Sequence, residues 1–293
     1  MEDRRKLILA IDFNNILYSA YYGEKLINSK GQNINAIKGF FFKIKSYIDS
    51  FMPDYLVFAN DLNRKLTFRY KMYPEYKGKR KQKDDNILFQ LSNALKIIDL
   101  LGYPIINNEL YEADDVLAMI SRLSEDNNMD VVIVSSDRDL YQLVTDHTSI
   151  LSPRKNDIIT PEFIMYNYGL TPDQWIELKV LQGDSSDNIP GVRGIGPTTA
   201  EELMRTYSTI ENIYNHLNEL PDKLQKKLIG GKNDIEFTRK LVTIVTDYKL
   251  IDLKIKNFDR GYIFANDVYK LIGELEIPSI YDIINQYMIV GVQ

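Results

Sequence analysis

The first 160 residues alternate short apolar runs of strand length with segments that repeat apolar residues at the period of a helix. The strand-length runs are 6–11, 54–59, 103–106 and 130–135, and the helical segments between them are 34–51, 86–101 and 114–126. Repetition of strand, helix and strand implies a mostly parallel sheet with helices on both faces. Residues 149–161 predict a hairpin or a pair of edge strands. We therefore expect an α/β fold with a mostly parallel central sheet flanked by helices.

The pattern changes at Thr171, after which strand-like runs fade. The stretch TPDQWIELKVLQG has proline at a first-turn position, which favours the start of a helix. A glycine-rich turn follows, and then a helix expected from about Pro197 to Tyr207. Further helical pieces are expected after it, with breaks at Pro221 and at the Gly230-Gly231 pair.

Composition limits the chemistry that this chain can carry. It contains no cysteine, and its two histidines, His147 and His216, stand in unrelated contexts. Disulfides and thiolate zinc sites are therefore excluded, and nothing supports a histidine metal site or Ser-His-Asp catalysis. Carboxylates, lysines and backbone amides must do any hard chemistry. No stretch reaches the ~18 apolar residues that span a membrane, and the apolar start lacks a cleavage site, so we expect a cytoplasmic protein without membrane contact.

Basic residues are concentrated in one segment, although the net charge of the chain is -5. Between Arg64 and Lys83 the only acid is Glu75, and a basic stripe of this kind can hold a phosphate backbone. Rings that could stack on the bases of a single strand alternate with the cations: Tyr70, Tyr73 and Tyr76 with Lys71, Lys77, Lys79 and Arg80. The alternative is a solvated basic loop. Because Pro74 and Gly78 oppose one continuous helix, we expect a mobile segment that orders when a strand binds.

Acidic residues follow every predicted strand. They are Asp12 after the first strand, Asp61 after the second, Glu112, Asp114 and Asp115 after the third, and Asp137 and Asp139 after the fourth. Because the carboxyl ends of parallel strands share one edge of a sheet, we expect these acids to converge on one rim, where open α/β sheets bind ligands. For any single residue, the alternative is helix capping and the helix dipole, which also favour acids at such positions.

Carboxylates at this density require a cation. Close pairs repel by about 4 kcal/mol at an effective dielectric of about 20, and all-oxygen ligands favour Mg²⁺ or Mn²⁺. Two such ions about 4 Å apart would stabilise both the attacking and the leaving oxygens of a phosphodiester displacement. Asp184 and Asp187 lie directly before the glycine turn, and they complete this metal site if the helical region docks on the rim.

The segment GVRGIGPTTAEEL predicts a phosphate-binding turn followed by a helix. Gly191, Gly194 and Gly196 allow positive φ angles and a close approach of backbone N–H groups, and the N-terminus of the following helix adds its positive dipole end. Contacts of this kind hold duplex phosphates without reading sequence. The alternative is an ordinary helix-helix turn, but the following PTTA and the preceding NIPGV favour the duplex interpretation.

With these residues in view, the sequence resembles the flap endonuclease or 5′-nuclease family, above all the 5′-nuclease domain of bacterial DNA polymerase I and its stand-alone bacterial and phage versions. The motifs that carry the resemblance are IDFNN, FRYKMYPEYKGKR, YEADDVLA, VSSDRDLYQLV, ITPEFIMYNYGLTPDQW and LQGDSSDNIPGVRGIGPTTA. The resemblance implies an α/β nuclease domain over 1–170 with a basic arch at about 64–85. It also implies a helical DNA-binding domain over 171–293 with a helix-hairpin-helix at about 173–207. Since no polymerase or proofreading portion follows, we expect a free-standing nuclease.

The resemblance also implies roles for individual residues. The acids of the family hold two divalent metals, and the matching positions are Asp12, Asp61, Glu112, Asp114, Asp115, Asp137, Asp139, Asp184 and Asp187. Lys77 and Arg80 match the basic arch pair that stabilises the scissile phosphate, and 191–196 matches the hairpin that commonly uses a potassium ion. DNA contacts are expected at Lys71, Tyr76, Lys79, Lys81, Gly191, Gly194, Gly196, Thr198 and Thr199. Phe13 replaces the small residue of many relatives and is expected to restrict the pocket.

The implied activity is a Mg²⁺-dependent 5′–3′ exonuclease or 5′-flap endonuclease in replication or repair. Its substrates would be DNA with 5′ ends, flaps or branched junctions, and RNA–DNA hybrids. Three alternatives stay open: a PIN-like RNA-directed nuclease, a module that binds branched DNA without cutting it, and a phosphatase built on Asp12. The phosphatase would require an aspartate where Asn14 stands. We expect a monomer, associated with the nucleoid of a bacterial or phage-infected cell.

Overall fold

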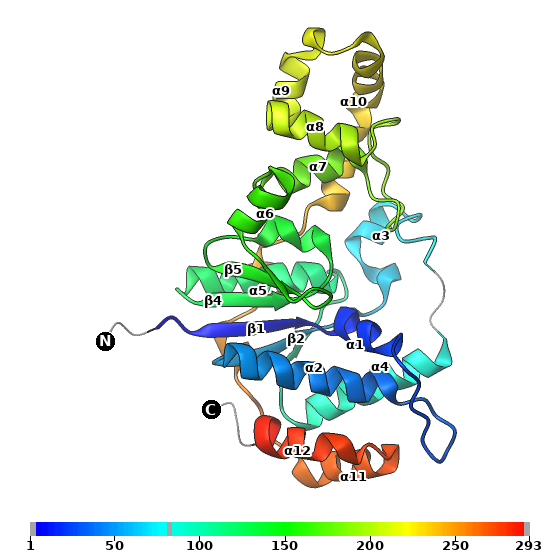
Figure 1. The fold of residues 1–293 in the computed structure, drawn as a ribbon, viewed down its shortest axis with the longest axis vertical. Helices are drawn as coiled ribbons and strands as arrows, with labels where there is room; N and C mark the ends of the chain where they lie inside the picture. Colours follow the sequence, from blue (N-terminus) through cyan, green and yellow to red (C-terminus); the bar gives the residue numbers. More distant parts are fainter. Residues whose placement is uncertain (1–3, 81–83, 290–293) are drawn as a thin grey trace.

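The computed structural model describes residues 4–80 and 84–289. One six-stranded sheet lies at its centre (Figure 1), formed by β1 (Leu7–Asp12), β2 (Tyr55–Ala59), β3 (Ile105–Ile106), β4 (Asp130–Val134), β5 (Thr148–Ser152) and β6 (Asp157–Ile159). The strand order is β3-β2-β1-β4-β5-β6, and every pairing is parallel except that of β5 with β6. The predicted mostly parallel sheet is therefore confirmed, and the residues expected to form an edge hairpin do so.

Helices lie on both sides of the sheet (Figure 1). They are α1 (Phe13–Tyr21), α2 (Asn35–Phe51), α3 (Phe68–Met72), α4 (Asp85–Leu100), α5 (Ala113–Asp126), α6 (Pro161–Tyr168), α7 (Gln174–Gln182), α8 (Pro197–Tyr207), α9 (Ile210–Asn215), α10 (Asp222–Val242), α11 (Ala265–Leu275) and α12 (Tyr281–Ile283). Short 3₁₀ segments are η1 (Arg64–Leu66), η2 (Arg138–Leu143), η3 (Leu217–Glu219), η4 (Tyr248–Ile251), η5 (Ile255–Phe258) and η6 (Pro278–Ile280), and η7 (Ile284–Ile289) is π-helical.

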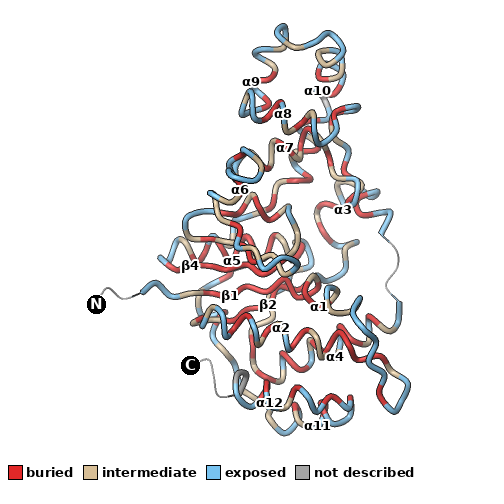
Figure 2. The backbone as a smooth tube through the Cα atoms, in the orientation of Figure 1, coloured by how far each residue is buried: buried red, intermediate tan, exposed pale blue. Residues whose placement is uncertain are grey.

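Two hydrophobic cores lie on opposite faces of the sheet, because successive residues of a strand point to opposite faces. Ile8 and Ala10 of β1 belong to the core that contains α5, α7 and α8, whereas Leu9 and Ile11 belong to the core that contains α1, α2 and α4. Figure 2 shows the resulting buried centre, with exposed residues gathered at the outer turns. The central strands β1, β2 and β4 carry unbroken apolar runs since both of their faces are covered.

The glycine pair in α10 does not end the helix, so that prediction is wrong. The helix starts directly after Pro221, as expected, and then continues through Gly230 and Gly231 to Val242. A Cβ on Gly231 would lie 2.7 Å from a methyl carbon of Val192. The glycine therefore serves packing, since it lets α10 approach the hairpin segment that contains Val192.

The last helices occupy a different place from the other helices of the second half. Residues of α11 and α12 join the core formed with α2 and α4, and α11 contacts α4 directly. Figure 1 shows them on the far side of the sheet from α7 to α10. The helices of the predicted helical domain, residues 171–293, thus lie at two ends of the molecule. Within the described ranges, no helix has the length and apolar character needed to cross a membrane.

Candidate metal and nucleic-acid site

The carboxyl ends of the parallel strands lie at one edge of the sheet, where the β1 arrow in Figure 1 points toward α1 and α3. Capping places acids at this edge. Asp12 ends β1 and accepts a hydrogen bond from the N–H of Asn15, while Asp137 and Glu112 stand at the N-caps of η2 and α5. The capping interpretation is therefore correct for these residues, but it does not account for the charge that they bring together.

Four acids of the rim share a negative field, and we call them the open acid group: Asp12, Asp61, Asp114 and Asp137. In the part of the chain that the structure describes, every ion pair involves other acids. Burial and repulsion by Asp61 raise the pKa of Asp12 to about 7, although Ser135 donates a hydrogen bond to it at 2.8 Å. Burial and repulsion by Asp137 and Asp12 also raise the pKa of Asp114 well above its usual value. The nearby charge of Lys77 opposes the rise at Asp114 without reversing it, and no ion pair among the described residues includes an acid of this group.

The remaining predicted ligands, apart from Asp115, contact cations of the chain itself. We call them the paired acid group: Glu112, Asp139, Asp184 and Asp187. Lys77 Nζ lies 2.6 Å from Glu112 Oε1 and 3.7 Å from Asp187 Oδ2, and Arg80 reaches Asp187 Oδ1 at 2.5 Å. Burial alone would raise the pKa of Glu112, but the charges of Lys77 and Arg69 lower it. The two cations predicted for the arch thus lie at the acid rim.

Lys179 of α7 is a site residue that the sequence analysis missed. Its Nζ contacts Asp139 Oδ1 and lies 2.7 Å from Asp184 Oδ2. Burial and repulsion raise the pKa of Asp139 to about 6 against the opposing charge of Lys179. Burial would also raise the pKa of Asp184, but hydrogen bonds from Lys179 and Ser186 lower it to about 2. The lysine joins an acid of the sheet rim to an acid before the hairpin, and its place shortly before Asp184 on a predicted helix was the only sequence signal.

Asp115 differs from the other predicted ligands in its contacts. Both of its oxygens bond the guanidinium of Arg69, at 2.5 and 2.8 Å, and it also accepts from the N–H groups of Glu112 and Val245. Arg69 in turn donates to two backbone carbonyls just after and at the end of α10. With four hydrogen bonds and full burial, Asp115 anchors Arg69 in this structure, and its role as a metal ligand stays a prediction.

Residues 75–80 of the basic segment pack on the site, and the expected mobility of the segment and its ordering by a bound strand stay predictions. Lys77, at a positive φ of 54°, donates its N–H to the carbonyl of Asp187 at 2.7 Å, and Asn188 donates to the carbonyl of Glu75. Tyr76 is 3 % exposed, and its hydroxyl donates to Glu112 at 2.7 Å. Tyr76 is therefore no stacking surface for a base, and that prediction is wrong.

The other cations of this segment differ in placement. Lys71 and Lys79 are exposed, as a contact to DNA requires. Lys81 lies outside the described residues. Phe13 also differs from expectation, because its side chain is fully buried beneath the sheet and packs edge-on against Phe40 with ring centroids 5.3 Å apart. It fills the core and does not restrict the pocket.

The hairpin between α7 and α8 uses its glycines in three different ways. Gly194 has a positive φ of 84°, which a residue with a side chain adopts only with strain. A Cβ on Gly191 would lie 2.3 Å from the backbone of Gln182 and Gly183, so close backbone approach requires glycine there. Gly196 is the N-cap of α8 and has open space around it. Thr198 and Thr199 occupy the first turn of α8, where their N–H groups lack helical partners.

The rim fits a divalent metal by the chemistry of its donors. Carboxylate oxygens are the ligands of Mg²⁺ and Mn²⁺, and repulsion between neighbouring acids raises the pKa of Asp12 and Asp114 in the open acid group. Among the described residues, no three acidic or histidine side chains form a ready-made coordination shell. Lys77 and Lys179 lie between acids, so binding of an ion would include small movements of side chains.

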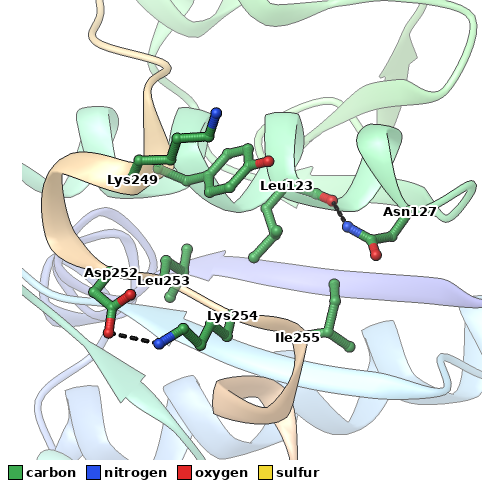
Figure 3. Close-up of a pocket in the computed structure, with 8 residues that line it drawn as sticks. Leu123, Asn127, Lys249, Asp252, Leu253, Lys254 and Ile255 are labelled. Atoms are coloured by element: carbon green, nitrogen blue, oxygen red, sulfur yellow. Dashed lines mark hydrogen bonds and ion pairs between the residues drawn. The ribbon is translucent and has the colours of Figure 1, made fainter.

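A cavity of about 370 Å³ lies away from this rim (Figure 3). It is lined by the end of α5, at Leu123 and Asn127, and by the 248–255 segment. A neighbouring hollow touches Lys6 and Met129, at the amino ends of β1 and β4. The one acid that lines the 370 Å³ cavity, Asp252, is paired with Lys254 at 2.7 Å. The cavity therefore offers no cluster of metal ligands.

The sequence matches two family models with adjoining ranges. The model for the 5′-3′ exonuclease N-terminal resolvase-like domain matches residues 7–169, and the model for the 5′-3′ exonuclease C-terminal SAM fold matches residues 170–262. Curated relatives include DNA polymerase I of Bacillus subtilis, 34% identical over 93% of this chain, and the thermostable DNA polymerase I of Thermus thermophilus, 36% identical over 83%. The chain spans 32% of the Bacillus protein and 29% of the Thermus protein.

Solved structures share the fold. T5 5′-exonuclease with bound zinc superimposes with a TM-score of 0.70 at 22% identity, over 91% of this chain and 99% of that one. The catalytic core of Rad2 in complex with DNA substrate gives 0.62 at 18% identity, over 95% of this chain and 90% of that one. Because the two family models together cover well over half of the sequence, this chain belongs to the 5′–3′ exonuclease family.

Proposed function

We propose that this chain is a divalent-metal-dependent nuclease that hydrolyses DNA phosphodiesters at 5′ ends and 5′ flaps. The observation that carries the proposal is the position of the open acid group near Lys77, with Arg80 paired to Asp187 at the same rim, in a chain of the 5′–3′ exonuclease family. Acids that repel one another favour metal binding, and cations next to them favour an anionic substrate. A phosphodiester beside a metal satisfies both.

The residues of the chain divide the work between them. Divalent metals, when bound, would supply Lewis-acid activation and neutralise charge on the reacting phosphate. Asp12, Asp61, Asp114 and Asp137 would hold them, together with acids of the paired group. Lys77 and Arg80 would release part of their contact with Glu112 and Asp187 and bind phosphate oxygens instead. The hairpin and the first turn of α8 would hold the duplex through its backbone.

Mg²⁺ is the proposed ion, and Mn²⁺ would substitute because it also prefers oxygen ligands. A potassium ion at the hairpin is a second part of the proposal. It would rest on hairpin carbonyls other than that of Gly194, since Lys227 Nζ already donates to this oxygen at 2.6 Å. Replacing potassium by sodium would then weaken duplex binding.

The substrate follows from the relatives and from the site. A chain related to part of DNA polymerase I, with the fold of a T5 exonuclease and of a Rad2 core bound to DNA, is proposed to act on 5′ strands at nicks, flaps and branched junctions during replication or repair. RNA–DNA hybrids belong to the same proposal. The protein would then work as a monomer in the cytoplasm, at the nucleoid.

A 5′-flap duplex, labelled at the flap, tests the proposal when it is incubated with the protein in Mg²⁺ and in EDTA. We expect cuts near the junction that require the metal. Asp114→Asn is the matched control, because it keeps the size of the side chain and removes one charge of the open acid group. An RNA flap run in parallel separates a DNA nuclease from an RNA-directed one.

One result would overturn the proposal. If the flap stays intact at every Mg²⁺ concentration while the protein remains bound to it, the acid rim is not a working metal site. The chain would then be a module that recognises branched DNA without cutting it.

A further inference from the structure

One face of α10 holds the hairpin at three points. Thr238 Oγ1 donates to the carbonyl of Pro190 at 2.8 Å, Gly231 meets Val192 without a side chain between them, and Lys227 Nζ donates to the carbonyl of Gly194 at 2.6 Å. These α10 positions are four and seven residues apart, so they lie on one side of the helix. Contacts with α10, whose contacting residues lie 33 to 48 positions further along the chain, therefore help to fix the conformation of the turn.

Lys227 brings a positive charge to the tip of that turn. A Cβ on Gly194 would lie 3.0 Å from Lys227 Cε, so the aliphatic stem covers the glycine that has the positive φ. Within the described residues, Lys227 forms no ion pair with an acid. An ammonium group has three donors, and one of them is used by Gly194. The other two and the whole charge remain available to a ligand.

We propose that Lys227 is a phosphate-binding residue of the duplex site, which it completes together with the hairpin. The inference rests on the proposed function and adds a residue that lies outside the hairpin motif. The ligand is a phosphodiester oxygen of duplex DNA, because an ammonium without an ion pair at the tip of this turn selects an anion. Contacts to backbone phosphates are independent of the base sequence. The bond to Gly194 holds the ammonium in place before DNA arrives.

The test is the salt dependence of duplex binding. Fluorescence anisotropy with a blunt duplex in EDTA measures affinity without cleavage. Lys227→Gln keeps an N–H donor for Gly194 and removes the charge. We expect the slope of log K against log salt to fall by about 0.9, and affinity at 0.1 M salt to fall roughly five- to tenfold. Lys227→Arg should restore both values toward those of the unchanged protein.

Lys226 provides the matched control. It is an exposed lysine on the same helix, about 100° around the axis from Lys227. We expect Lys226→Gln to leave the slope unchanged. An equal loss in both variants would mean that only the general charge of α10 matters, and it would overturn the inference.

Other outcomes are also decisive. If Lys227→Gln binds with the unchanged slope while its melting temperature falls, Lys227 is only a tie that holds the turn, and the inference is wrong. Lys227→Met, which keeps the stem over Gly194 and has no donor, must then show the same unchanged slope. If the unchanged protein does not bind duplex DNA at all, the proposed function fails, and this result is distinct from a failure of Lys227.

Discussion

The two acid groups of the rim differ in what lies next to their buried carboxylates. In the paired acid group, Lys77, Arg80 and Lys179 lie within contact distance of the carboxylates, and the pKa of Asp184 falls to about 2. In the open acid group, Asp12 and Asp114 face other acids, and the pKa of each rises. One group forms ion pairs with cations of the chain, and the other is the proposed site of an ion from outside.

The two groups therefore have different roles: the paired acid group stabilises the site, and the open acid group is proposed to bind its ligand. The paired acid group joins the sheet rim, the basic segment and the helical half, since Lys179 links Asp139 to Asp184 and Lys77 links Glu112 to Asp187. Breaking such a buried pair leaves an uncompensated charge. In the open acid group, loss of a charge relieves repulsion. Substitutions in the two groups should therefore have opposite effects on stability, even where both remove activity.

The largest effect is expected for Asp114→Asn. We expect cleavage of the flap duplex to fall by about 10²- to 10³-fold, because the proposed metal site loses one carboxylate. The melting temperature in EDTA should stay the same or rise, since the amide is not repelled by Asp137 and Asp12. Single-turnover cleavage and thermal unfolding measure the two quantities. A variant that melts well below the unchanged protein would place Asp114 in the paired acid group instead.

Lys77→Met should come next in size. We expect turnover to fall by about 10²-fold, the cost of one lost electrostatic donor. Stability should fall too, by about 3 kcal/mol, because Glu112 is left without its main partner in a buried position. Lys79→Met, which changes an exposed lysine of the same segment, is the control. A change in turnover below about threefold would mean that Lys77 serves the structure and contacts phosphate without assisting the reaction.

The positions of the acids could be predicted from sequence, because a strand period and a following aspartate are local signals. The carboxyl edge of a parallel sheet then brings them together whatever the loops do. The turn at 191–196 was equally local. The sequence could not predict which side chain contacts which acid. Lys179, Arg69 and Tyr76 acquire their roles from contacts between segments far apart in the chain, and their residue types alone do not select a partner.

The same limit explains where the structure differs from what the sequence led us to expect. Asp115 stands beside Asp114 in the motif, but a helix turns by about 100° per residue, so one side chain faces the rim and the other faces Arg69. The pair Gly230-Gly231 predicted a helix break from its residue types, but α10 continues through it and Gly231 packs against Val192. Phe13 follows Asp12, a predicted metal ligand, yet as the first residue of α1 it points into the core.

Asp115→Asn tests the division between neighbours. We expect a loss of about 3 kcal/mol in the free energy of unfolding, because the bidentate pair with buried Arg69 is weakened. Mg²⁺ affinity, measured by calorimetry, should change little. Asp114→Asn should give the reverse: lower metal affinity and no loss of stability. If Asp115→Asn instead abolishes metal binding in a protein that melts normally, then Asp115 is a ligand and its contact with Arg69 is secondary.

The smallest effect is a shift of melting temperature with pH, and its sign follows from two buried acids with raised pKa, one in each group. Asp12, with a pKa of about 7, and Asp139, with about 6, keep their protons in the folded state at pH values where the unfolded chain, with carboxyl pKa values near 4, has lost them. The folded state then binds more protons, so metal-free stability is highest below about pH 4 for these groups and falls as pH rises toward 7. The lowered pKa of Asp184 acts only below about pH 4.

We therefore expect the melting temperature in EDTA to fall by several degrees between pH 5 and 8. Mg²⁺ should restore more of the lost melting temperature at pH 8, where protons no longer compete with the metal for the carboxylates. Asp12→Asn should flatten the metal-free curve. A melting temperature that rises over this range would show that the open acid group is already neutralised within the chain.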